Sequence, residues 1–176
     1  MKRLFVVLIG LALAGAASHA YAHDAGAGAE EYGAIDAHAT DDGNVVEGSV
    51  LVRGTVSALK VDLYQLERWP QVFSDARAVS RNADETWSVD FQRFGHAHDF
   101  TFMRVPSGVV FELAAKDHGR ARLEYALEPI DATRSKLTVR LVAATPPQLT
   151  TEQFTATLRA KVQSDLDDFS NRASAR

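Results

Sequence analysis

The chain contains no cysteine among its 176 residues, which excludes disulfide bonds, thiolate metal sites and a cysteine nucleophile. It also has no excess of positive charge. The formal net charge is −4, so the chain offers no basic field for phosphates and we expect no nucleic-acid partner. The motifs G-x-S-x-G, H-E-x-x-H and a phosphate-binding loop are absent as well. The sequence therefore gives no positive indication of catalysis, and we expect neither a metal nor a cofactor.

What is present is the composition of an ordinary globular domain. Apolar residues make up 46% and charged residues 24% of the chain, which excludes a disordered protein. The segment 23–44 is rich in Ala, Gly and Asp without apolar periodicity, and it is interpreted as a flexible linker. We expect one folded domain over 45–170 and a disordered tail over 171–176.

Residues 1–22 have the features of a cleavable signal peptide. Two basic residues precede an apolar run over 4–17, and Ala20-Tyr21-Ala22 supplies a small-x-small cleavage site. A retained membrane anchor is the alternative, but the run is short and rich in Gly and Ala. We therefore expect export to the periplasm and a mature chain that begins at His23.

The domain opens with one strand and two helical segments. Val, Thr and Leu predominate over 46–56, which predicts a long strand with Gly48 as a bulge or bend. Helical spacing over 60–66 predicts a short helix, and Trp69-Pro70 is expected to interrupt it because proline cannot continue a helix. A second short helix is predicted over 71–75.

Apolar and polar residues then alternate with period two in six successive segments. Short connections join these segments, one of them marked by Pro106-Ser107-Gly108. The pattern predicts an antiparallel meander with one apolar face. The segments begin at 76 and are centred on 89, 101, 111, 125 and 139.

The chain ends with an amphipathic helix. Pro146-Pro147 ends the last strand, and Thr150 with Gln153 forms the capping-box pattern of a helix start. An apolar stripe then recurs every three or four residues along one face. We expect this stripe, which contains Phe154, Leu158, Val162, Leu166 and Phe169, to pack on the apolar face of the sheet.

This order of elements, together with the segment VDLYQLERWPQVFSD over 61–75, resembles the START-like (SRPBCC) superfamily, which includes polyketide cyclases and coenzyme-Q-binding proteins. The resemblance covers about 45–169. It implies an α+β helix-grip fold, in which a curved antiparallel sheet of about seven strands wraps round the C-terminal helix. Two short helices follow the first strand, and an apolar cavity is expected between the sheet and the long helix.

The inward positions of this arrangement give a candidate binding site. One helix cannot fill a strongly curved sheet, so a cavity lined by large apolar side chains is expected. Each of these side chains could instead simply fill the core. The candidate wall residues are Trp87, Phe91, Phe100, Phe102, Phe111, Tyr125, Phe154 and Leu158.

Polar candidates lie among the wall residues. His98 and Arg104 share the inward phase of their strand, where they could anchor a ligand, form an internal ion pair, or lie at solvent-exposed strand ends. Tyr125 could offer its hydroxyl to a ligand or form a hydrogen bond to the backbone within the core. His96 with His98, or an N-terminal His23, could bind metal weakly, but we assign no metal site.

Three hypotheses follow. The first is a monomeric periplasmic carrier that binds an apolar small molecule or lipid between the sheet and the C-terminal helix. The second is a cyclase or aromatase on the same fold, with His98, Arg104 or Tyr125 acting on the substrate. The third is an envelope interaction module with a packed core and a protein partner at its strand edges.

Overall fold

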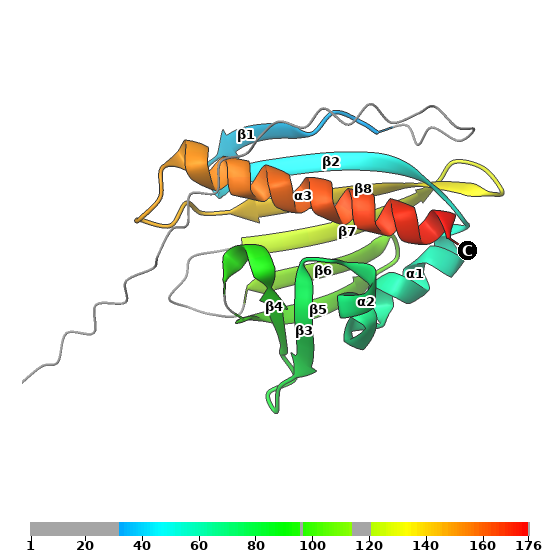
Figure 1. Cartoon of the computed structure of the whole chain (residues 1–176), viewed down its shortest axis with the longest axis horizontal. Coiled ribbons are helices and arrows are strands. Elements are labelled where there is room, and N and C mark those ends of the chain that lie inside the picture. The colour runs from blue at the N-terminus through cyan, green and yellow to red at the C-terminus, as the bar shows by residue number, and fades with distance from the viewer. Residues whose placement is uncertain (1–31, 96, 114–120, 176) are drawn as a thin grey trace, which may run out of the picture.

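A computed structural model describes residues 32–95, 97–113 and 121–175. The expected signal peptide, the first part of the expected linker and His96 lie outside these residues. Within them, one antiparallel sheet has eight strands in the order β1-β2-β8-β7-β6-β5-β4-β3 (Figure 1). The strands are β1 (Asp36–Thr40), β2 (Gly43–Arg53), β3 (Ala76–Arg81), β4 (Trp87–Phe91), β5 (Ala97–Val105), β6 (Gly108–Leu113), β7 (Ala121–Pro129) and β8 (Arg134–Ala143).

The six-strand meander is confirmed as β3 to β8. Each of these strands pairs with the next along the chain. Strand β2 pairs with β8 at the end of the meander, with Val52 opposite Ser135. Alternation places Leu137, Val139 and Leu141 in the core while the residues between them are less buried. The fold is therefore α+β, with the apolar face of the sheet turned toward the helices.

The helical segments between β2 and β3 start and end differently from the prediction. Helix α1 (Val56–Tyr64) begins at the Thr55 cap, a 3-10 turn η1 (Leu66–Arg68) follows, and α2 (Trp69–Val72) completes the excursion. Helix α1 ends at Tyr64, with Gln65 as its C-cap, and not at Trp69-Pro70. Proline lies in the first turn of α2, where its missing N–H is not needed, so the prediction that Trp69-Pro70 ends a helix was wrong.

The long helix α3 (Thr151–Ser174) covers β2 and β8, and its C-terminal end lies beside α1 (Figure 1). The predicted capping box is present: Gln153 N donates to Thr150 Oγ1 at 3.2 Å, and Thr150 N donates to Gln153 Oε1 at 3.1 Å. Gly48 is not a bulge, because β2 pairs with β8 without a register shift. A Cβ there would lie 2.9 Å from Leu166 Cδ1, so Gly48 lets α3 approach the sheet.

Two predicted boundaries were wrong. Residues 36–44, assigned to the linker, form β1 and the start of β2. Residues 171–174, assigned to the tail, continue α3 to Ser174. The edge strand β1 was missed because four of its five residues are exposed and carry no apolar alternation.

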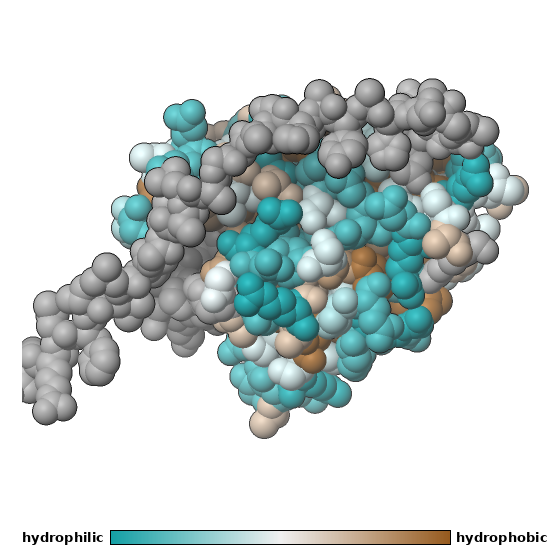
Figure 2. Space-filling model, viewed as in Figure 1, coloured by the Kyte–Doolittle hydropathy of each residue, from teal (hydrophilic) through white to brown (hydrophobic). Residues whose placement is uncertain are grey.

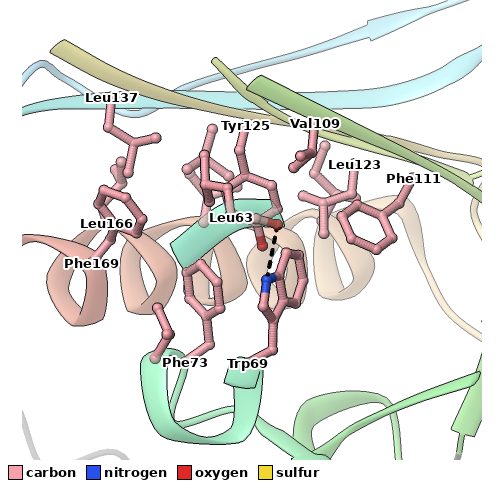
Figure 3. Packing of buried hydrophobic residues seen from close by; sticks show 14 of the residues in the cluster. Leu63, Trp69, Phe73, Val109, Phe111, Leu123, Tyr125, Leu137, Leu166 and Phe169 are labelled. Carbon is pink, nitrogen blue, oxygen red and sulfur yellow. Dashed lines mark hydrogen bonds between the residues drawn. The ribbon is translucent and has the colours of Figure 1, made fainter. Parts of the chain in front are cut away.

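The core centres on aromatic side chains that rise from α2 toward the sheet (Figure 3). Trp69 and Phe73 are both fully buried, and the Trp69 ring lies 4.6 Å from Phe111 and 5.3 Å from Tyr125, between ring centres. Trp69 Nε1 donates to the Leu63 carbonyl at 3.4 Å. The short helices therefore fill the part of the sheet that α3 does not cover. No helix in the described part of the chain is long and apolar enough to cross a membrane.

Candidate functional site

A continuous cluster of aromatic rings runs across β4, β5 and β6 into the core. Its half-buried members are Trp87, Phe94, His98 and Phe102, and its buried members on the strands are Phe91, Phe100 and Phe111. We call these seven residues, with Trp69, Phe73 and Tyr125, the aromatic cluster. Apolar surface that is only half-buried beside a filled core is the kind of surface that an apolar ligand could cover.

The ring contacts of this cluster join its surface members to its interior. Phe102 lies 6.4 Å from Trp87 and 5.0 Å from Phe111, and Phe111 contacts Trp69. A second branch runs from Phe94 to Phe91 at 6.1 Å. These distances are those of favourable edge-on and tilted aromatic pairs. Two groups of half-buried rings, Trp87 with Phe102 and Phe94, are therefore in contact with the same buried core.

The polar candidates of the sequence analysis are placed in different surroundings. His98 lies half-buried with its ring 5.9 Å from Phe94 and 6.1 Å from Phe100. Arg104 is exposed at the far end of β5, where its guanidinium donates to the Tyr64 carbonyl at 3.1 Å. Six residues of extended strand separate the two, about 20 Å. The structure therefore does not bring His98 and Arg104 into one catalytic site.

Tyr125, Phe154 and Leu158 are buried. Phe154 and Leu158 extend from α3 into the core, while the Tyr125 hydroxyl donates to Asp165 Oδ2 at 2.7 Å. The bonding partner of Tyr125 is therefore a carboxylate of α3, and neither of the two partners considered from the sequence.

Four buried polar side chains meet beneath the aromatic cluster, and we call them the buried polar cluster: Asp75, Tyr125, Lys161 and Asp165. Lys161 Nζ lies 2.6 and 2.7 Å from the two oxygens of Asp165 and 3.7 Å from Asp75 Oδ2. Asp75 Oδ1 accepts from the backbone N–H of Arg93 at 2.9 Å. The ammonium also lies 4.3 Å from the centre of the Phe91 ring, so the two clusters are in contact.

Burial dominates the electrostatics of this group. Removal from water raises the pKa of Asp165, although the charge and hydrogen bonds of Lys161 and the Tyr125 hydroxyl oppose the shift. Burial and the neighbouring Asp165 carboxylate raise the pKa of Tyr125 well above its usual range. Tyr125 therefore stays protonated and acts as a donor.

Lys161, Asp165 and Asp75 were not among the site residues predicted from the sequence. A signal was present for two of them. Lys161 and Asp165 are one turn apart and lie between the apolar stripe positions Leu158, Val162 and Leu166, so helical spacing places them on the inner face. Asp75 carries no comparable signal, because it lies in the irregular connection between α2 and β3.

A hollow of about 650 Å³ lies on the opposite face of the sheet, away from α3. Charged residues of β6, β7 and β8 line it and pair across strands, with Arg122 2.8 Å from Glu112 and Arg140 3.7 Å from Glu124. This polar hollow differs in place and character from the predicted apolar cavity. On the face that α3 covers, Figure 2 shows mostly hydrophilic surface with small hydrophobic patches, one of them over α1.

No metal site is evident in the part of the chain that the structure describes, where no group of three or more His, Asp or Glu residues is arranged to hold an ion. The proposed pair of His96 and His98 lies partly outside this part, and His23 lies wholly outside it.

Comparison with known proteins identifies the fold. No protein-family model matches the chain, and no curated protein matches its sequence. Among solved structures, a START superfamily protein from Mycobacterium smegmatis superposes with a TM-score of 0.64 at 13% identity, over 74% of this chain and 97% of that one. An aromatase/cyclase from a Streptomyces species gives 0.59 at 17% identity, over 75% and 94%. A STAR-related lipid transfer protein from Xanthomonas axonopodis gives 0.58 at 12% identity, over 82% and 98%. The chain has the START-like helix-grip fold of these neighbours.

Proposed function

We propose that this protein is an exported carrier that binds an apolar small molecule or lipid at the aromatic cluster, between the β4–β5 part of the sheet and the helices. The observation that carries the proposal is the continuity of the rings. They lead from half-buried Trp87, Phe102 and Phe94 to fully buried Phe91 and Phe111. A ligand that covers the outer rings would therefore be in contact with the interior.

The physical driving force is burial of apolar surface, about 25 cal/mol for each Å² removed from water before ordering costs. The outer rings retain exposed area that a ligand can cover, and aromatic side chains can tilt against one another without losing favourable contacts. The core is otherwise filled by Trp69 and Phe73. Uptake therefore involves movement of rings at the β4–β5 side.

Structural similarity supports the same class of ligand. Of the neighbours, one is named as a lipid transfer protein and another as an aromatase/cyclase, and a lipid is an apolar ligand of the class proposed for this chain. A carrier is favoured over an enzyme because His98 and Arg104 lie about 20 Å apart on one strand, where they cannot act together on one small substrate.

Export rests on residues 1–22, whose basic start, apolar run and Ala20-Tyr21-Ala22 match a signal peptide. We therefore place the carrier in the periplasm. Fractionation of the cell envelope and N-terminal sequencing test this part of the proposal: a periplasmic chain that begins at His23 supports it, and a cytoplasmic chain that begins at Met1 contradicts it.

The binding function is tested by native mass spectrometry of the mature protein, followed by extraction into organic solvent. A stoichiometric adduct that the solvent removes supports the carrier and identifies its ligand class. A ligand-free mass that does not change when a panel of lipids and aromatic compounds is added contradicts it, and favours an envelope interaction module with a packed core.

A further inference from the structure

The buried polar cluster contains one carboxylate oxygen that accepts no hydrogen bond from the described part of the chain. Asp75 is 4% exposed, and its Oδ2 atom has no hydrogen-bond partner among the residues that the structure describes, although Oδ1 accepts from Arg93 N. The nearest cation to Oδ2 is Lys161 Nζ at 3.7 Å, which is beyond hydrogen-bond distance. A buried carboxylate oxygen in this state is costly unless another group completes its bonding.

We infer that Asp75 Oδ2 and Lys161 Nζ form a subsite for the hydroxyl group of the ligand. The inference rests on the proposed carrier function and names the polar end of its ligand. A hydroxyl oxygen can lie at about 2.8 Å from both atoms across the 3.7 Å that separates them. It would accept from the ammonium and donate to the carboxylate, which uses both abilities of a hydroxyl.

The charges of the subsite favour a neutral group over an acid. Asp75 and Asp165 place two carboxylates beside one ammonium, and the Arg93 guanidinium, 3.8 Å from Asp75 Oδ1, is 40% exposed. A ligand carboxylate at the same place would add a third negative charge in a site removed from water. An alcohol or phenol therefore fits the subsite, and a fatty or aromatic acid does not.

The subsite also lies close to Phe94, one of the half-buried rings of the aromatic cluster. The Phe91 ring is 4.3 Å from Lys161 Nζ and 6.1 Å from the half-buried Phe94 ring, between centres. A flat ligand that inserts between Phe91 and Phe94 would therefore bring a substituent to the ammonium. These contacts point to an aromatic or polycyclic alcohol as the ligand class.

Calorimetric titration with four probes of equal ring size tests the inference on the wild-type protein: naphthalene, a naphthol, the matching methoxynaphthalene and the matching naphthoate. The naphthol should bind about tenfold more tightly than naphthalene, because one hydrogen bond to a charged group is worth about that factor. Methoxynaphthalene, which can accept but cannot donate, should lose most of this gain. The naphthoate should bind most weakly.

Asp75→Asn localises the effect, since it removes the charge with little change of shape. We expect the preference for naphthol to fall below about threefold and the naphthoate to gain affinity, because one negative charge is gone. The matched control is Asp62→Asn. Asp62 is equally buried but pairs with Arg172 Nε at 3.3 Å near the end of α3, and its substitution should leave the probe preference unchanged.

The outcomes separate the two proposals. If none of the four probes binds and no natural ligand co-purifies, the carrier function fails and the subsite fails with it. If naphthalene binds as tightly as the naphthol, or methoxynaphthalene equals the naphthol, the carrier stands and the hydroxyl subsite is overturned by the wild-type protein alone. An unchanged preference in a folded Asp75→Asn variant overturns the assignment to Asp75.

Discussion

Lys161 holds both carboxylate oxygens of Asp165, at 2.6 and 2.7 Å, and neither side chain is exposed to solvent. Two opposite charges one helical turn apart thus face the core together from α3. Removing such a pair from water is expensive, and the mutual attraction of the charges only partly offsets that cost. We therefore expect the stability of the fold to depend on both residues and on the pH.

Breaking this pair should destabilise the protein more than replacing it. We expect Lys161→Met to lower the free energy of unfolding by about 3–5 kcal/mol, because Asp165 is left as an uncompensated buried charge. The double variant Lys161→Met/Asp165→Leu should lose less than the single variant. Urea denaturation measures both, and a double variant that is less stable than Lys161→Met would contradict this account.

Titration of Asp165 should contribute to the pH dependence of the free energy of unfolding. Its pKa in the folded protein is raised above the ordinary value of 3.8, so the folded state keeps a proton that the unfolded chain has released. The contribution of this group is therefore present below 3.8 and is lost as the pH rises through the raised pKa. Asp165→Asn should flatten this decline in urea midpoints measured at successive pH values.

Asp131 should change the pH dependence of stability in the opposite direction to Asp165, and it serves as the control for the Asp165 prediction. Hydrogen bonds from Thr133 and Arg134 lower its pKa to about 2. Its contribution is present above 3.8 and is lost as the pH falls through about 2. Asp131→Asn should therefore change only the acid side of the curve, and an effect like that of Asp165→Asn would refute the assignment.

Tyr125→Phe should remove a buried donor without creating a large cavity. The hydroxyl bonds to Asp165 Oδ2 at 2.7 Å, and loss of a hydrogen bond to a charged group costs about 1.5–3 kcal/mol. Because burial raises its pKa, Tyr125 should not ionise in the folded protein. Spectroscopic titration of the two proteins should therefore give equal tyrosinate absorbance until alkaline unfolding begins, and an earlier additional tyrosinate in the wild type would contradict burial.

Neighbouring residues on β5 give a matched test of the aromatic cluster. Phe102 points to the inner face and contacts Phe111, whereas Met103, 36% exposed, points to the other face. Phe102→Glu should weaken uptake of an apolar probe by about tenfold or more, since it places a charge where apolar surface is buried. Met103→Glu should change uptake less than about twofold. Equal effects of the two substitutions would place the ligand elsewhere.

The close approach of α3 to β2 should be sensitive to a single methyl group. In Gly48→Ala the added Cβ would lie 2.9 Å from Leu166 Cδ1 and 3.2 Å from Val162 Cγ1. Overpacking of this kind costs about 1–3 kcal/mol. Shortening the neighbour with Leu166→Val should restore part of the loss in thermal denaturation, and an absence of any rescue would locate the strain elsewhere.

The sequence predicts the strands and helices whose apolar residues recur at a regular spacing. Period-two alternation identified β3 to β8, and the apolar stripe with its Thr150 cap identified α3, because burial of one face imposes a period on each element. It does not locate the break near Gln65, where no glycine or proline occurs and packing of Leu66 and Trp69 into the core decides the path.

The site was predicted less completely than the fold. Six of the wall candidates are aromatic residues of the strands, and period-two alternation alone assigns them to the inner face, while helical spacing assigns Phe154 and Leu158. The burial of Lys161 and Asp165 is a tertiary property, since the same charges on a helix are usually solvated. Asp75 meets them only because the connection between α2 and β3 passes under α3, a proximity that no local pattern encodes.

The pairing of β2 with β8 has a consequence for the order of events during synthesis. Asn44 lies opposite Ala143, 99 residues later in the chain. β2 can pair with β1, and the intervening strands can pair with their neighbours, as soon as they emerge, but the other edge of β2 must wait until β8 has been synthesised. Contacts of such long sequence separation slow folding, so the pairing of β2 with β8 should be among the last steps in which the sheet forms.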